Sequence, residues 1–168
     1  MTRRAAFLLA IATAGLSACG FRPLYADGSS GVAGAQLSMV AVGAIDDRSG
    51  WLLRNALIDR LGGEAEPEGA RYRLEVEIDD DITRFGIRGD AAATRERRTL
   101  RARYQLVDME TGETLLDSTA GSDAGIDITS SEYATVAAEE TAAERLSREV
   151  ADDIVGRLGL YFNRMSDR

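Results

Sequence analysis

The chain has 168 residues with a formal net charge of −8, and all 20 of its basic residues are arginines, because it contains no lysine and no histidine. This acidic balance disfavours nucleic acid as a partner, since binding it requires a basic surface. With one cysteine and no histidine, the chain cannot form an internal disulfide, a serine triad with a histidine base, or a histidine or thiolate zinc site.

Residues 1–18 have the layout of a secretory signal peptide. Two arginines precede an apolar run over residues 5–14, which is too short to span a bilayer, since that takes about 20 apolar residues. The run leads into "LSAC" (16–19), which matches the lipobox of bacterial lipoproteins, where the chain is cut before a cysteine that becomes acylated. We therefore expect Cys19 to be the lipidated first residue of the mature protein. The alternatives are an ordinary cleaved signal with a free thiol, or a buried thiol in a cytosolic protein.

Removal of the leader leaves 150 of the 168 residues and changes the formal charge from −8 to −10, because the leader holds two arginines and no acid. A chain of this length forms one domain with a sizeable core. Acyl chains on Cys19 would hold the protein on a membrane without crossing it. Residues 19–35 include the small-residue run "ADGSSGVAGA" and are expected to tether the lipid to a domain over residues 36–168.

The domain is expected to begin with a strand and a helix. Residues 36–43, "QLSMVAVG", have the apolar density of a strand. Asp47 or Ser49 is expected to cap the helix that follows, and the Gly62–Gly63 pair to end it. The apolar positions of this helix recur at spacing four, at Leu53, Leu57 and Leu61.

Two later segments alternate between apolar and polar residues, as half-buried strands do. They are "RYRLEVEID" (71–79) and "RERRTLRARYQLVD" (95–108), and a weaker third strand is expected around "TLLDSTAG" (114–121). The three strands predict an antiparallel meander with one solvated face. The residues expected to face the core are Tyr72, Leu74, Val76, Ile78, Leu100, Ala102, Tyr104, Leu106, Leu116, Ser118 and Ala120.

A last helix is expected from about Thr129, which forms a capping-box pattern with Glu132, to about Tyr161. Its apolar stripe comprises Val136, Ala143, Leu146, Val150, Ile154 and Leu158. The element order β-α-β-β-β-α predicts the α+β class: a single two-layer domain in which two helices cover one face of a mostly antiparallel four-stranded sheet.

Arginines are concentrated at the predicted hairpin, which is expected to close near residues 86–91. Glu75 and Glu77 then fall roughly opposite Arg101 and Arg103, and cross-strand ion pairs would neutralise part of the arginine row. Alternatively, five arginines near the end of the hairpin remain unpaired and bind phosphate or carboxylate groups. These candidates are Arg84, Arg88, Arg95, Arg97 and Arg98.

The sequence offers little for catalysis, and we expect no enzymatic activity, no cofactor and no metal. The acidic run Asp79–Asp81 could bind a hard cation through oxygen ligands. It lacks, however, the spaced acidic residues and the glycine turn of a calcium-binding loop, and a solvated strand end is the simpler interpretation. A hydrolase that works with two carboxylates is an open alternative, although the sequence does not locate a cleft for it.

Four segments resemble, in chain order, the LptE family of outer-membrane lipopolysaccharide-assembly lipoproteins. They are "LSACGFRPLY", the helix "LLRNALIDRL", the strand "RYRLEVEI" and the final helix "SEYATVAAEETAAERLSREVADDIVGRL". The most specific is the lipobox followed by "FRPLY", a start that is typical of one branch of the family. The resemblance covers essentially the whole mature chain.

The resemblance implies a non-enzymatic protein that plugs the lumen of the outer-membrane β-barrel LptD, assists its assembly and contacts lipopolysaccharide through basic side chains. Gly20 follows Cys19 where an aspartate would signal inner-membrane retention, which favours the outer membrane. A barrel lumen is polar and wet, so a charged sheet face suits a plug. The alternative is a generic lipid-anchored envelope protein that scaffolds another complex and does not co-purify with such a barrel.

Overall fold

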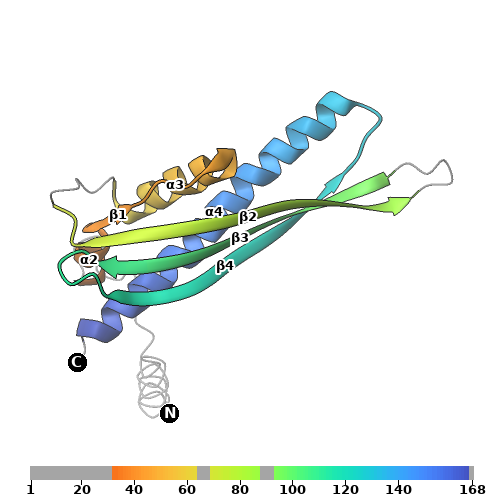
Figure 1. The fold of residues 1–168 in the computed structure, drawn as a ribbon. Helices are drawn as coiled ribbons and strands as arrows, with labels where there is room; N and C mark the ends of the chain where they lie inside the picture. The colour runs from red at the N-terminus through yellow and green to blue at the C-terminus, as the bar shows by residue number, and fades with distance from the viewer. Residues whose placement is uncertain (1–31, 64–68, 88–92, 167–168) are drawn as a thin grey trace, which may run out of the picture.

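The structure is a computed structural model, which describes residues 32–63, 69–87 and 93–166 (Figure 1). Cys19, Arg88 and most of the expected tether lie outside the described residues. The elements in chain order are α2 (Val32–Leu37), β1 (Val40–Val42), α3 (Asp47–Leu61), β2 (Tyr72–Ile87), β3 (Ala93–Asp108), β4 (Thr114–Asp127) and α4 (Glu132–Ser166).

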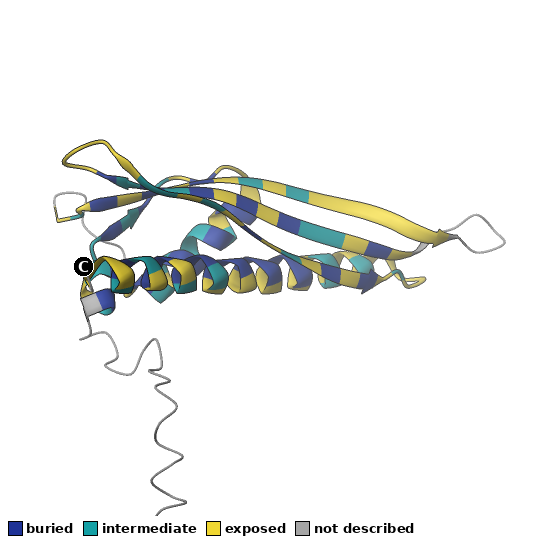
Figure 2. Cartoon of the chain, turned by 90° about the horizontal axis from the view of Figure 1, so that it is seen from below, coloured by how far each residue is buried: buried dark blue, intermediate teal, exposed yellow. Residues whose placement is uncertain are grey.

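The four strands form one sheet in the order β1-β2-β3-β4. β1 is parallel to β2, and the two remaining pairs are antiparallel. The long helix α4 runs behind the sheet, and α3 packs beside it in the same layer (Figures 1 and 2). The predicted α+β domain with a mostly antiparallel sheet and helices on one face is therefore confirmed.

The N-terminal part of the domain differs from the prediction. Residues 32–35, expected as the end of the tether, begin helix α2, whose Ala33 and Leu37 are buried in the core. The strand expected over residues 36–43 is therefore wrong in its first half, and only Val40–Val42 pair with β2. Burial of two apolar side chains favours the helix over the extended chain that small residues would otherwise adopt.

The core lies between the inward face of the sheet and the helices. The predicted inward residues are buried in β2 and β3 except Ile78, which is half-buried, and the ring of Tyr72 packs 5.1 Å from that of Phe162 on α4. The predicted stripe of α4 is also buried, except Val136, which is 47% exposed. Val136 lies in the first turns of α4, which project past the edge of the sheet in the view of Figure 1.

The helix starts use caps other than the predicted ones. Asp46 stands at the N-cap position of α3 without a side-chain capping hydrogen bond, Asp47 is the first helical residue, and the Ser49 side chain is hydrogen-bonded to Asp80 of β2. The start of α4 is capped by Ser131, whose Oγ accepts a hydrogen bond from Ala134 N–H at 3.4 Å, so the Thr129 capping box is wrong. The predicted glycine stop of α3 is confirmed, since Gly62 has a left-handed φ of 97°.

Two helix glycines should respond in opposite ways to substitution by alanine. A Cβ on Gly50 of α3 would lie 2.8 Å from the carbonyl oxygen of Ile45, whereas one on Gly156 of α4 would meet nothing within 4 Å. Gly156→Ala should therefore stabilise the fold by about 1 kcal/mol through helix propensity. Gly50→Ala should destabilise it, because the overlap with backbone outweighs that gain. Urea unfolding of both variants checks this, and equal shifts in midpoint would contradict it.

Candidate functional site

The hairpin end of the sheet, which comprises residues 80–87 of β2 and 95–100 of β3 and is called the tip below, holds the candidate arginines. Arg84 and Arg98 occupy inward positions of their strands, whereas Arg95 and Arg97 occupy outward ones. The four described candidates therefore do not form one cluster.

The expectation that these arginines remain unpaired is wrong for all four described ones. Each has a carboxylate within reach: Arg84–Glu96 at 2.6 Å, Arg95–Asp127 at 3.1 Å, Arg97–Asp123 at 3.7 Å and Arg98–Asp80 at 2.6 Å. The edge strand β4 supplies two of the four acids, Asp123 and Asp127. The register between β3 and β4 places acids beside Arg95 and Arg97, and the register between β2 and β3 places acids beside Arg84 and Arg98.

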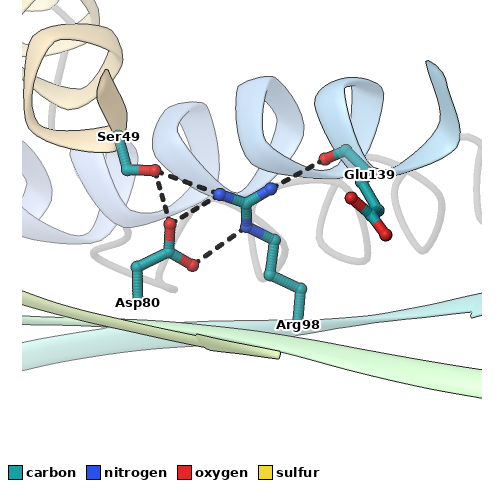
Figure 3. Close-up of polar contacts among 4 residues, drawn as sticks. All are labelled: Ser49, Asp80, Arg98 and Glu139. Atoms are coloured by element: carbon teal, nitrogen blue, oxygen red, sulfur yellow. Dashed lines mark hydrogen bonds and ion pairs between the residues drawn. The ribbon is translucent and has the colours of Figure 1, made fainter. Parts of the chain in front are cut away.

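Arg98 joins four elements at the inward side of the tip (Figure 3). Its guanidinium donates to both carboxylate oxygens of Asp80 on β2, from Nε at 2.9 Å and from Nη2 at 2.6 Å. It also donates to Ser49 Oγ of α3 at 3.2 Å and to the carbonyl oxygen of Glu139 on α4 at 3.0 Å. Ser49 in turn donates to Asp80. One arginine thus ties two strands to both helices.

The ion pair at the centre of this network is largely shielded from water, with side-chain exposures of 15% for Arg98 and 17% for Asp80. Burial alone would raise the pKa of Asp80, but hydrogen bonds from Arg98 and Ser49, together with the charge of Arg98, lower it overall. Hydrogen bonding to Asp80 raises the pKa of Arg98. Both groups therefore stay charged at neutral pH.

Two glutamates, Glu96 and Glu139, lie beside this network. Glu96 of β3 is 1% exposed, and its Oε1 accepts a hydrogen bond from Arg84 Nε at 2.6 Å. Burial of Glu139, followed by its hydrogen bond to Glu96, raises the pKa of Glu139, and the charges of Arg84 and Arg98 oppose this effect only in part. Two carboxyl groups that share one site favour a proton on one of them.

Sequence analysis missed this network, although a signal for it was present. Asp80, Glu96 and Arg98 occupy even-numbered positions, the same ones that carry the buried residues of β2 and β3. Charged residues at inward positions must find partners when they are buried. The break in the apolar pattern at these three positions is therefore the signal in the sequence for a buried charged network.

The outward face of the sheet carries a basic strand beside an acidic one. Arg103 forms a bidentate pair with Asp117 of β4, and this pair, with a hydrogen bond from Gln105, lowers the pKa of Asp117 to about 2. Glu77 lies opposite Arg103, as predicted, but Glu75 lies opposite Gln105. The predicted neutralisation of the arginine row thus occurs, but it runs to β4 rather than to β2.

Arg101 is the exception in this row, since it forms no ion pair with any described residue. The open hollow of about 590 Å³ near this position lies on the helix side of the sheet, where Ile78, Ala102 and Ala120 line it together with Asp153 and Arg157 of α4. The side chain of Arg101 lies close to Gly121 of β4, where an added Cβ would be 3.3 Å from Arg101 Cγ. A larger residue at position 121 would therefore shift the Arg101 side chain. The outward face can therefore offer one unpaired guanidinium to an anionic group.

Two absences hold for the described ranges. No group of three or more acidic or thiol ligands there could hold a metal ion. No described helix is long and apolar enough to cross a membrane.

Substitution of Arg98 should cost far more stability than substitution of its neighbour Arg97. Arg98→Met leaves Asp80 partly buried without a counter-charge and should destabilise the fold by about 2–4 kcal/mol. Arg97→Met breaks only an exposed pair, in which both side chains are at least 60% exposed, and should cost less than about 1 kcal/mol. Urea unfolding of the two variants and of Arg98→Met/Asp80→Asn measures this. Similar losses for the two single variants would show that the network is not special.

Glu139→Gln should stabilise the protein increasingly as the pH rises. Because the folded state raises the pKa of Glu139 above 4.5, the contribution of this group is complete at lower pH and is lost as the pH rises through the raised pKa. Glutamine has the same shape as glutamate and never becomes charged, so the variant does not lose folding stability as the pH rises. Melting temperatures of both proteins between pH 4 and 8 check the prediction. A constant difference across this range would contradict it.

Three solved structures share the architecture described above. A protein from Caulobacter crescentus, described as a lipoprotein, is 26% identical with a TM-score of 0.64 and covers 81% of this chain and 98% of its own. The rare lipoprotein B of Shewanella oneidensis is 10% identical with a TM-score of 0.58, and the match covers 76% of this chain and 98% of that protein. Lipoprotein B of Nitrosomonas europaea is 12% identical with a TM-score of 0.56, and the match covers 74% of this chain and 83% of that protein. The last two show the fold alone.

At the level of sequence, no curated protein matches the chain. The family model described as "LptE: Lipopolysaccharide-assembly" matches residues 37–158, from the end of α2 to the last turns of α4. The match includes the whole sheet, both long helices and all members of the network at the tip. This protein therefore belongs to the LptE family of lipopolysaccharide assembly.

Proposed function

We propose that this protein is a non-enzymatic outer-membrane lipoprotein that plugs an LptD-type β-barrel, assists its assembly and helps to deliver lipopolysaccharide to the cell surface. The family match over residues 37–158 carries this proposal. The lipobox motif at Cys19 supports an anchor on the periplasmic side of the outer membrane, held by acyl chains.

The outward face of the sheet suits the inside of a barrel. Arg95, Arg97 and Arg103 are each paired with an acid of β4, so the face is polar and rich in hydrogen-bonding groups without a large excess of either charge. The lumen of an outer-membrane barrel is polar and water-filled, and a plug must satisfy its side chains. An apolar face would be expected for a partner inside the lipid instead.

Contact with lipopolysaccharide is proposed for the outward arginines of the tip. Arg95 and Arg97 each face a single exposed acid, and a phosphate group could replace that acid as their partner. Arg98 is held in the buried network and is not available, so only part of the original group of five remains suited to this role. Arg101 adds an unpaired guanidinium on the same face.

The proposal is tested by pulling down the C-terminally tagged protein from native membranes in mild detergent. We expect one large β-barrel in roughly equal amount, together with bound lipopolysaccharide. Arg95→Gln/Arg97→Gln should lower the co-purified lipopolysaccharide roughly fivefold to tenfold, since each lost charge-assisted contact weakens binding. Cys19→Ala should release the protein from the membrane fraction.

The matched control is Arg145→Gln/Arg148→Gln, which removes two arginines of exposed i,i+4 pairs on α4. This variant should retain lipopolysaccharide. Recovery of the protein without any barrel would contradict the plug role and favour a generic lipid-anchored scaffold. Equal loss of lipopolysaccharide in both double variants would contradict the assignment of the contact to the tip.

A further inference from the structure

β2 becomes an edge strand of the sheet where β1 ends. β1 pairs with β2 only up to Leu74, and the bond from Gly43 N–H to Leu74 C=O is the last one on this side. β2 continues to Ile87 with β3 as its one neighbour in the sheet. In Figure 1 the part of β2 nearest the hairpin extends well past β1 and α3. An uncovered edge of this kind can accept a further strand.

The main-chain groups on this edge can be identified from the pairing. Tyr72 N–H donates to Met39 and Leu74 C=O accepts from Gly43, so the even-numbered residues of β2 direct their main-chain groups away from β3. The register between β2 and β3 is unbroken from Tyr72 to Phe85, so this parity persists toward the hairpin. Within the described ranges, Asp80, Ile82 and Arg84 therefore present main-chain N–H and C=O groups without a strand partner.

The outward face of this edge carries an acidic row. Glu77, Asp79 and Asp81 stand at alternate positions, about 7 Å apart, and none of them forms an ion pair with a described residue. Three outward arginines of β3, Arg95, Arg97 and Arg103, instead pair with acids of β4. A strand added beside β2 would meet this row directly, and basic residues on it would gain the cross-strand pairs that β3 does not provide.

On the helix side of the same edge, Ile82 lies between Asp80 and Arg84, whose charges are paired with Arg98 and Glu96, and it is exposed together with apolar side chains of α4. Ile82 is 37% exposed, and Val136 and Tyr133 of α4 are 47% and 86% exposed. Val136 lies one turn before Glu140, whose carboxylate is 3.3 Å from Arg48 at the start of α3. This face of α4 therefore points toward the α3 and β2 side of the layer. An added strand would cover these side chains with its inward residues.

We propose that the edge of β2 around Asp80, Ile82 and Arg84 binds an extended segment of another protein as a fifth strand, with basic residues on its outward face and apolar residues on its inward face. The acids on the outward face, the exposed apolar side chains of Ile82, Val136 and Tyr133 on the inward face, and the main-chain groups without a strand partner favour this alternation. A second copy of this chain does not fit, because two β2 edges would place acids opposite acids. The inference does not depend on the identity of the barrel partner.

The test uses a fluorescein-labelled nine-residue peptide, with blocked ends, in which arginine alternates with valine, and the purified lipoprotein in mild detergent. The control peptide has the same composition with its arginines clustered. We expect the alternating peptide to bind about tenfold more tightly than the clustered one by anisotropy, because only alternation matches both faces. Equal binding of the two would show simple charge attraction and overturn the proposal.

Protein variants separate charge from strand pairing. Asp79→Arg/Asp81→Arg should weaken binding about tenfold, whereas Glu110→Arg/Glu113→Arg, the same charge change in the turn after β3, should change it less than about twofold. Ile82→Pro removes one edge N–H outside the ladder with β3 and should weaken binding about fivefold to tenfold, whereas Ile82→Val should not.

Hydrogen exchange gives a readout that surface attraction cannot produce. Without peptide, the amides of Asp81 and Thr83 should already be protected by β3, and those of Ile82 and Arg84 should exchange rapidly. Saturating peptide should slow Ile82 and Arg84 about tenfold or more. Unchanged exchange at these two amides would overturn the proposal even if the peptide binds, and this result does not require the proline variant to fold.

Discussion

The packing of the inward face of three long strands against α4 is the interaction on which the rest of the structure depends. Leu100, Tyr104 and Leu106 of β3 are fully buried there, as are Leu146 and Ile154 of the helix. Apolar burial of this kind is the main favourable term in folding. It also orients every other side chain of the sheet, because residues next to a buried one must face outward.

The apolar row ends before the strands do, and the tip is the consequence. β2 and β3 continue past Leu100 with Asp80, Glu96 and Arg98 at inward positions, where burial without a partner would be costly. Arg98 meets this cost by bonding to Asp80, to Ser49 and to the α4 main chain. The tip is thus held to α3 and α4 by charged and hydrogen-bonded groups rather than by apolar packing.

The inward and outward faces of the tip have different roles. The inward face is structural, since its charges satisfy one another, and the outward face remains available to solvent or a partner. Because the arginines of β3 pair with β4, the acids at the edge of β2 lack ion pairs in the described part of the chain. The same register thus balances charge between β3 and β4 on the outward face and leaves acids without ion pairs along the edge of β2 on that face.

Local patterns in the sequence determined the α+β class, the alternation in β2 and β3, the stripe of α4 and the glycine end of α3, because each depends on neighbours a few residues apart. The lipobox and the family resemblance were also readable there. Only the tertiary structure decided that α2 is helical, that Ser49 bonds to Asp80 rather than capping α3, and which acid pairs with each arginine. These outcomes depend on strand register and on contacts between residues far apart in the chain, which composition and periodicity do not encode.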